Sequence, residues 1–139
     1  MKILFDTNIV LDVLLNRLPH SVAAVKLFSA IENKTIEGVL CATTITTIDY
    51  LVSKSAGKST AKHAIRCLLS LFEIAEVNVS ILNSALKSEF SDFEDAVLFY
   101  SGLERQIEAV VTRNINDFKP ANSPIYTPDA LLAVIESMY

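Results

Sequence analysis

Glycine is scarce in this chain, and its scarcity excludes several classes of function. Only three glycines occur among 139 residues, which leaves no Gly-rich loop of the kind that cradles phosphates in P-loop and dinucleotide-binding proteins. Tryptophan is absent, and the only cysteines are Cys41 and Cys67. They lie in separate apolar segments without metal-ligand spacing, so the sequence predicts two plain buried thiols in a reducing cytoplasm.

Long apolar runs are also missing. No uninterrupted apolar segment is long enough to cross a bilayer. Asp6 and Asp12 interrupt the only apolar run near the N-terminus, so no secretory signal is predicted. We therefore expect a cytoplasmic protein without membrane association. A chain of 139 residues without repeats or a Pro/Gly-rich linker is expected to form one domain, residues 1–139.

One internal stretch lacks acidic residues. Between Tyr50 and Phe72 there is no Asp or Glu, although the whole chain has a net charge of −4. The cations of this stretch recur at four-residue spacing: Lys54, Lys58, Lys62 and Arg66. The last three of them could form a stripe along one helix face. The stripe is either a solvated face or a surface that contacts RNA phosphates.

Strand-like and helix-like segments alternate along the chain. Short apolar runs predict strands at 3–5, 38–42, 74–77, 109–112 and 125–126. Helical patterns fill the intervals, and Ser21 is expected to cap the second helix. The apolar residues of that helix recur at helical spacing: Val22, Val25, Phe28 and Ile31. This alternation predicts a three-layer α/β/α sandwich with a central parallel sheet of four to five strands.

Acidic residues follow or flank the predicted strands. They are Asp6 after the first strand, Asp49 in the helix after the second, Asp92 and Asp95 in an acidic segment, and Asp117 after the fourth strand. Residues just past the carboxyl ends of parallel strands converge on one edge of the sheet, so these carboxylates are expected to share a pocket. Clustered carboxylates repel one another unless protons or a cation neutralise them. Because Mg²⁺ and Mn²⁺ prefer hard oxygen ligands, the sequence predicts metal-assisted phosphate chemistry.

Each acidic position also has a simpler interpretation. Asp6 alone could cap the helix that follows it, and Asp92 and Asp95 could form the cap of a later helix. Asp49 lies either on the solvent face of its helix or against a site. Asp12 is expected to be exposed or locally hydrogen-bonded, with support of a nearby metal ligand as the alternative.

The chain resembles PIN-domain proteins. The resemblance rests on three ordered segments: Phe5-Asp6-Thr7-Asn8-Ile9-Val10-Leu11-Asp12, Asp92-Phe93-Glu94-Asp95-Ala96, and Val111-Thr112-Arg113-Asn114 with Asp117-Phe118. It covers essentially the whole chain. PIN domains are small α/β/α nucleases that use Mg²⁺ or Mn²⁺ to cut RNA. Many stand-alone members are toxins of toxin–antitoxin pairs, and they are commonly dimers.

The resemblance implies a metal-dependent endoribonuclease that leaves a 3′-hydroxyl and a 5′-phosphate. An antitoxin protein and a second copy of the chain are the partners it implies. By position, Asp6 and Asp95 would hold the metal, with Asp117 or Asn114 as the fourth acid of the family pattern. Asp49 stands where the family usually has Glu and would complete the catalytic set. Secondary contributions are expected from Asn8, Asp92, Thr112 and Asn114.

The same residues bear on RNA binding and on the alternatives to a nuclease. RNA contacts are expected from Lys54, Lys58, Lys62, Arg66 and Arg113. The competing hypothesis is a non-catalytic PIN-fold module that binds RNA or protein, which Asp49 and Asn114 would favour. A receiver-like Mg²⁺-binding domain is disfavoured because no lysine follows a late strand and the first strand ends in a single Asp.

Overall fold

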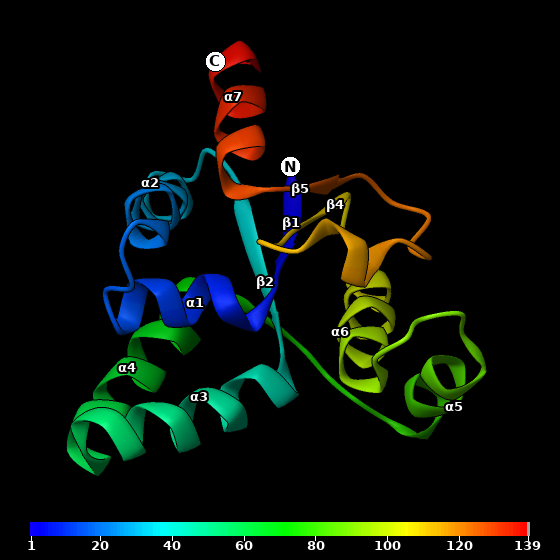
Figure 1. Ribbon diagram of the computed structural model, residues 1–139, viewed down its shortest axis with the longest axis horizontal. Helices are drawn as coiled ribbons and strands as arrows, with labels where there is room; N and C mark the ends of the chain where they lie inside the picture. Colours follow the sequence, from blue (N-terminus) through cyan, green and yellow to red (C-terminus); the bar gives the residue numbers. More distant parts are fainter. Residues whose placement is uncertain (139) are drawn as a thin grey trace.

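The computed structural model describes residues 1–138 and has a five-stranded sheet at its centre (Figure 1). The strands are β1 (Lys2–Phe5), β2 (Glu37–Cys41), β3 (Glu73–Ala75), β4 (Ala109–Val111) and β5 (Ile125–Tyr126). They lie in the order β3-β2-β1-β4-β5, and every neighbouring pair is parallel. The predicted parallel sheet is confirmed.

Helices follow the strands in an alternating order. Those of the described chain are α1 (Thr7–Leu14), α2 (His20–Glu32), α3 (Ala42–Ala56), α4 (Lys58–Leu71), α5 (Val79–Lys87), α6 (Phe93–Glu104), the 3₁₀ helix η1 (Ile115–Phe118) and α7 (Pro128–Met138). Thr127 caps α7, as its position before Pro128 suggests, by accepting a hydrogen bond from the Ala130 amide at 3.2 Å. None of these helices is long and apolar enough to cross a membrane.

The sheet separates two apolar clusters. Successive residues of a strand point to opposite faces, and in β1 Ile3 and Phe5 join the cluster beneath α1 to α4, whereas Leu4 joins the cluster beneath α5 and α6. All three side chains are fully buried. Figure 1 shows α1 to α4 on one side of the sheet and α5 and α6 on the other. Burial on both faces explains why the strands read as bare apolar runs, and it confirms the α/β/α class.

Expectations about α2 are partly wrong. The helix begins before Ser21, which is buried and makes no cap, because Pro19 occupies the capping position. Val22 and Val25 are 55% and 48% exposed. Phe28 and Ile31 are buried as expected, and Ala24 and Leu27 are buried in place of Val22 and Val25. The predicted apolar face is therefore right in the second half of the helix and wrong in the first.

Only one of the two cysteines is buried as expected. Cys41 is buried at the carboxyl end of β2, whereas Cys67 is exposed on α4. The difference follows from helix periodicity, because Ala64 and Leu68 take the buried positions of α4 and leave Cys67 on the outer side.

Candidate metal centre at the carboxyl edge of the sheet

Asp6 lies where β1 passes into α1. β1 pairs with β4 so that Phe5 is opposite Val111, which makes the next residues, Asp6 and Thr112, neighbours at the carboxyl edge. The buried Thr112 hydroxyl donates a hydrogen bond to Asp6 Oδ2 at 2.8 Å. Asp6 makes no side-chain cap on α1. The capping interpretation of Asp6 is therefore wrong, and its carboxylate is oriented by the neighbouring strand.

The Thr112 hydroxyl is itself held by the loop after β4. The Asn114 backbone N–H donates to Thr112 Oγ1 at 3.1 Å, so this oxygen accepts one hydrogen bond and donates another to Asp6. Asn114 contributes its backbone in this way while its side chain is exposed. The two residues link the β4–η1 loop to the carboxylate at the end of β1.

Negative neighbours act on Asp6. Its side chain is 7% exposed, and this burial raises its pKa above the usual value. Hydrogen bonds from the Thr112 side chain and the Thr7 backbone lower the pKa of Asp6 in part, while the charges of Asp117 and Glu94 raise it further. Asp117 lies in η1, immediately after the loop that fixes Thr112. The Asp6 carboxylate is thus held in place but only partly stabilised in its charged form.

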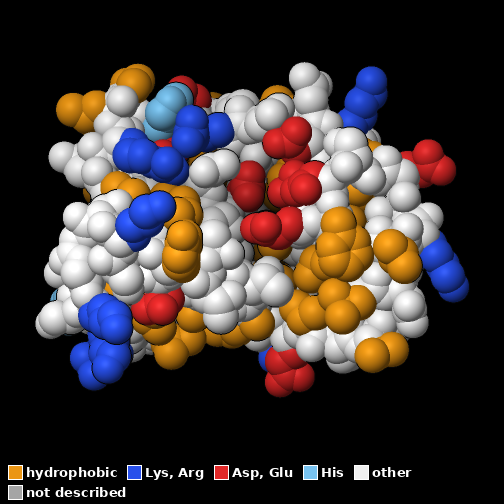
Figure 2. All heavy atoms as spheres, turned by 60° about the horizontal axis from the view of Figure 1, so that its bottom comes forward, with side chains coloured by type: hydrophobic (Ala, Val, Ile, Leu, Met, Phe, Trp, Pro, Cys, Tyr) orange, Lys and Arg blue, Asp and Glu red, His pale blue; other side chains and the backbone are white. Residues whose placement is uncertain are grey.

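Asp95 completes what we call the acidic cluster: Asp6, Asp95 and Asp117. Asp92 caps α6 by accepting a hydrogen bond from the Asp95 backbone N–H at 3.2 Å, so the capping interpretation holds for Asp92. Burial, followed by the charges of Asp6, Asp92 and Asp117, raises the pKa of Asp95 to about 7. Figure 2 shows acidic side chains gathered at the centre of one face, between Lys and Arg side chains and a hydrophobic area.

The acidic cluster has the donor chemistry that Mg²⁺ or Mn²⁺ requires. Its ligands would be carboxylate oxygens, and a cation would relieve the repulsion that raises the pKa values of Asp6 and Asp95. Among residues 1–138, no three Asp, Glu, His or Cys side chains yet converge closely enough to hold one ion. The cluster therefore fits a divalent ion by charge and ligand type, and its carboxylates must rotate to share one.

Asp49 is not brought into this cluster. It lies on α3, which begins at Ala42 on the same edge of the sheet. Asp49 is two helical turns beyond Ala42, about 10 Å along the helix axis. Its side chain is exposed, and the main charges acting on Asp6 and Asp95 do not include it. The polar contact that α3 makes near the cluster comes from its first turn, where the Thr44 hydroxyl lies 2.9 Å from that of Thr7.

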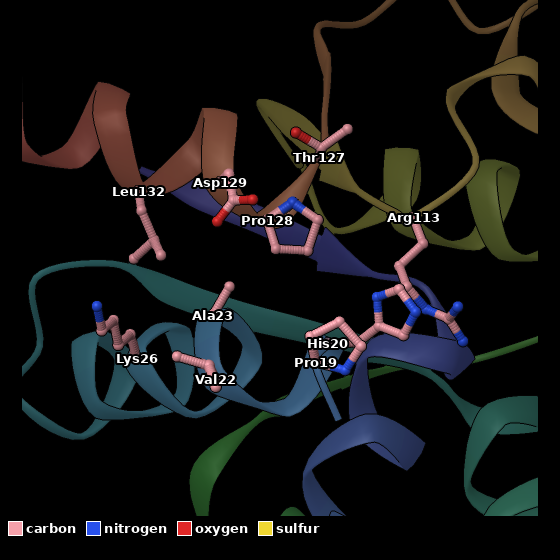
Figure 3. A pocket seen from close by; sticks show the side chains of 10 residues that line it. All are labelled: Pro19, His20, Val22, Ala23, Lys26, Arg113, Thr127, Pro128, Asp129 and Leu132. Atoms are coloured by element: carbon pink, nitrogen blue, oxygen red, sulfur yellow. The ribbon is translucent and has the colours of Figure 1, made fainter. Parts of the chain in front are cut away.

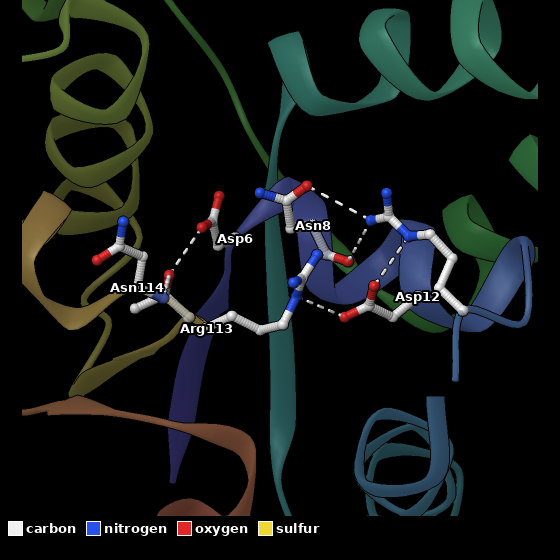
Figure 4. A network of polar contacts seen from close by, with 7 residues as sticks. Asp6, Asn8, Asp12, Arg113 and Asn114 are labelled. Carbon is white, nitrogen blue, oxygen red and sulfur yellow. Dashed lines mark hydrogen bonds and ion pairs between the residues drawn. The ribbon is translucent and has the colours of Figure 1, made fainter. Parts of the chain in front are cut away.

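Asp12 is fully buried, so its expected exposure is wrong, whereas the alternative of a local hydrogen bond is met by Arg17. Arg17 Nε donates to Asp12 Oδ1 at 2.9 Å, and Arg113 Nε lies 2.9 Å from Oδ2 (Figure 4). The second contact is an ion pair by distance, but its N–H does not point closely enough at the oxygen to form a hydrogen bond. Arg17 Nη2 also reaches the Asn8 carbonyl at 3.2 Å and Asn8 Oδ1 at 3.4 Å.

Sequence reasoning missed this network for two reasons. The Asp12–Arg17 contact spans a helix end, where no periodic pattern identifies a pair. Arg113 comes from a loop far along the chain, and its partner became apparent only once β1 and β4 were placed side by side. Apolar neighbours on both sides of Asp12 were the available signal for its burial.

The basic residues expected to contact RNA do not share one environment. Lys54, Lys58, Lys62 and Arg66 are exposed on α3 and α4, with the Lys54 ammonium 5.7 Å from the centre of the Tyr50 ring. Arg113 instead belongs to the Asp12 network. Exposure is what both the solvated-face and the RNA-contact interpretations of the basic stretch require.

A cavity of about 410 Å³ adjoins Arg113 (Figure 3). It is lined by Pro19, His20, Val22, Ala23, Lys26, Arg113, Thr127, Pro128, Asp129 and Leu132. No member of the acidic cluster lines it. The chemistry of the carboxyl edge and this hollow therefore meet at Arg113.

Comparisons with known proteins agree with this fold. The family model for the PIN domain matches residues 2–116, and a search of curated proteins gave no match. A structure of VapBC2 from Rickettsia felis bound to a DNA fragment from its promoter has a TM-score of 0.70 and 16% identity, covering 91% of this chain and 98% of that chain. A toxin–antitoxin complex from Klebsiella pneumoniae gives 0.67 and 23%, covering 90% and 96%. Mycobacterium tuberculosis VapC20, described as a sarcin-ricin loop cleaving toxin, gives 0.63 and 15%, covering 78% and 86%.

Proposed function

The chain belongs to the PIN-domain family, and on that premise we propose that it is a divalent-metal-dependent endoribonuclease. The observation that carries the proposal is the acidic cluster, in which burial and mutual repulsion raise the pKa values of Asp6 and Asp95. Perturbed carboxylates gathered at the carboxyl edge of a parallel sheet are typical of a catalytic site.

Asp6, Asp95 and Asp117 would hold one or two Mg²⁺ or Mn²⁺ ions, directly or through water; Asp49, which lies outside the cluster, is not part of this set. Such an ion supplies activation of water near neutral pH and neutralises charge at the phosphate. The protein's part is to hold the carboxylates: Thr112 fixes one Asp6 oxygen, and the Asp92 cap fixes the backbone that carries Asp95. As the resemblance to PIN-domain nucleases implies, hydrolysis would leave a 3′-hydroxyl and a 5′-phosphate.

The exposed basic stretch on α3 and α4 is proposed to contact the RNA backbone. Each phosphate contact by Lys54, Lys58, Lys62 or Arg66 would release condensed counterions and make binding salt-dependent. A net charge of −4 does not oppose this, because the cations are concentrated in one acid-free stretch.

We extend the proposal to the toxin of a toxin–antitoxin pair that acts in the cytoplasm as a homodimer. Its support is that two of the similar structures described above are VapBC2 and a complex described as toxin–antitoxin. The second candidate is a non-catalytic module that binds RNA or protein. The exposed position of Asp49 favours it, because that residue stands where the family usually has Glu.

The test is cleavage of a labelled single-stranded RNA by the full chain with Mg²⁺, with Mn²⁺, and with excess chelator. We expect cleavage with either metal, none in chelator, and 5′-phosphate ends on the products. Cleavage that persists in chelator would reject the metal-dependent mechanism. RNA binding without cleavage in either metal would favour the non-catalytic module.

A further inference from the structure

Arg113 stands between the acidic cluster and the cavity, and a buried carboxylate holds it there. We propose that Asp12 is a positioning residue that fixes the guanidinium of Arg113 as a contact for a substrate phosphate beside the acidic cluster. The proposal rests on the proposed RNA-cleaving function and adds a residue that the carboxyl-edge pattern does not predict.

Two side-chain links join the same pair of chain segments. Thr112 binds Asp6, and the next residue, Arg113, contacts Asp12, which lies on the helix that follows Asp6. Figure 4 shows the Arg113 side chain extending from the β4–η1 loop across to Asp12, alongside the Asp6–Thr112 contact. A change in the loop that moved the Arg113 backbone would therefore also move the hydroxyl that orients Asp6.

The atoms of Arg113 that face Asp12 leave the rest of its donors available. Arg113 uses Nε against Asp12, and no residue in the described part of the chain accepts a hydrogen bond from its terminal Nη atoms. Its side chain is 31% exposed. Arg17 differs, because its Nη2 is already occupied by Asn8. The planar guanidinium of Arg113 can thus keep one edge on Asp12 and offer its terminal N–H groups to phosphate oxygens.

Asp12 also explains why Arg113 stays apart from the acidic cluster. An unattached guanidinium beside Asp6 and Asp95 would be drawn toward them and would compete with a metal ion. The Asp12 side chain is only 1% exposed, so its attraction for Arg113 is weakly screened by water and salt. The carboxylate therefore separates a phosphate-binding cation from the metal-binding anions a short distance away.

The cavity gives the rest of the nucleotide a place beside this contact. Arg113 forms part of its wall together with His20 and Thr127, while Pro19 and Leu132 supply apolar surface (Figure 3). Its volume of about 410 Å³ falls within the range of about 300–1,000 Å³ that small-molecule sites occupy. A strand with one phosphate at the acidic cluster and the neighbouring phosphate on Arg113 would run toward this hollow.

The experiment compares Arg113→Gln, Arg113→Lys, Asp12→Asn and the double variant Asp12→Asn/Arg113→Gln. Affinity for a fluorescein-labelled single-stranded RNA is measured by anisotropy in EDTA over a range of salt, and KM and kcat are measured with Mn²⁺. Lys34→Gln is the matched control, because it removes one exposed cation on the connection into the amino end of β2.

For Arg113→Gln we expect Kd and KM to rise about tenfold with kcat nearly unchanged, and the salt slope to fall by about 0.7. Asp12→Asn should raise Kd in the same direction, and the double variant should be no worse than Arg113→Gln, since Asp12 acts through Arg113. Arg113→Lys should recover little of the affinity, because an ammonium cannot face both Asp12 and a phosphate. Lys34→Gln should match wild type.

Additive losses in the double variant, full rescue by Arg113→Lys, or unchanged RNA affinity in Arg113→Gln would each overturn the proposal. Unchanged RNA affinity is also the result expected if this surface binds an acidic protein segment instead of RNA. If Asp12→Asn does not fold, the comparison of Arg113→Gln with Arg113→Lys decides alone. Binding in EDTA does not depend on catalysis, so a wild type that binds RNA through Arg113 but never cleaves it contradicts only the proposed nuclease function.

Discussion

Asp6 and Asp12 are both buried carboxylates at one end of the molecule, yet their surroundings are opposite. Asp12 lies between two guanidinium groups, each with its Nε 2.9 Å from a different carboxylate oxygen. Asp6 has a hydroxyl and a backbone amide as its hydrogen-bond partners, and its charged neighbours are acids. The charge of Asp12 is therefore compensated inside the protein, whereas the charge of Asp6 is not and favours binding of a cation.

Spatial neighbours, and not position in the sequence, distinguish a carboxylate suited to a metal ion from one that binds arginine. Both residues lie in the first of the PIN-like segments, and both follow apolar residues. Their neighbours from β4 and the β4–η1 loop make the difference, because Thr112 faces Asp6 and Arg113 faces Asp12. We therefore expect changes at Asp6 to affect chemistry first and changes at Asp12 to affect stability and substrate placement first.

The largest expected effect is on cleavage. Asp6→Asn and Asp95→Asn should each lower kcat by at least about 100-fold, because both remove charge that holds the ion and organises the phosphate. Asp49→Asn should cost less, since Asp49 is exposed two turns along α3. Glu104→Gln, which removes an exposed acid at the last position of α6, is the control and should cleave as wild type does. An Asp6→Asn protein with an unimpaired rate would refute the assignment of the acidic cluster.

The next effect concerns stability and differs between Asp12 and Asp95. Asp12→Asn should lower the free energy of unfolding by about 1.5–3 kcal/mol, because it removes a buried charge-assisted partner of two arginines. Asp95→Asn should leave the metal-free protein as stable as wild type or more stable at pH 8, because it removes a repelled carboxylate. Urea unfolding in EDTA measures both. Equal destabilisation by the two substitutions would mean that the charge of Asp95 is compensated in the fold as well as that of Asp12.

A pH dependence follows from the raised pKa values. The pKa of Asp95 rises from 3.8 unfolded to about 7 folded, and that of Asp6 rises also. The folded state therefore holds more protons than the unfolded state in this window, so these groups stabilise the fold fully below about pH 4 and lose that contribution as the pH rises through about 7. Urea midpoints in EDTA at pH 5 and pH 8 should show the decline, and Asp95→Asn should reduce it. Saturating Mg²⁺ should oppose the decline, because the ion binds the ionised carboxylates.

The sequence was informative about these regions to different degrees. Bare apolar strands and their alternation with helices were enough to predict the parallel sheet, because burial on both faces leaves a strong signal. The same topology placed Asp6, Asp95 and Asp117 at one edge, as expected. Asp49 illustrates the limit, because the end of β2 fixes only where α3 begins, and Asp49 lies two helical turns beyond that point.

Two other predictions from the sequence, the Ser21 cap and the exposure of Asp12, were wrong because of neighbours that local patterns do not show. Ser21 has the right residue type for a cap, but the preceding Pro19 already occupies the capping position of α2. The burial of Asp12 depends on Arg113, which is distant in sequence and is brought near by the pairing of β1 with β4. Local patterns cannot predict a contact that exists only after the sheet is assembled.

The smallest expected effect on the fold belongs to the basic stretch. Lys58→Glu combined with Lys62→Glu should weaken RNA binding and reduce the salt slope by about 1.4, since two phosphate contacts are lost. The free energy of unfolding should change by no more than a few tenths of a kcal/mol. The control is Lys34→Glu with Arg105→Glu, which changes the same charge near the amino edge of the sheet. Equal losses in both proteins would mean that only net charge matters and that the stripe is a solvated face.

We propose that the acidic cluster holds a divalent ion, whereas the Asp12 network does not need one. Anomalous diffraction from crystals soaked in Mn²⁺ tests it most directly, with Asp95→Asn crystals as the control. We expect a manganese peak within ligand distance of the Asp6 and Asp95 carboxylates in the wild type, a weaker peak or none in Asp95→Asn, and an Asp12–Arg113 pair unchanged in both. A peak elsewhere, or one at the cluster that is unaffected by Asp95→Asn, would contradict a metal site held by Asp6 and Asp95.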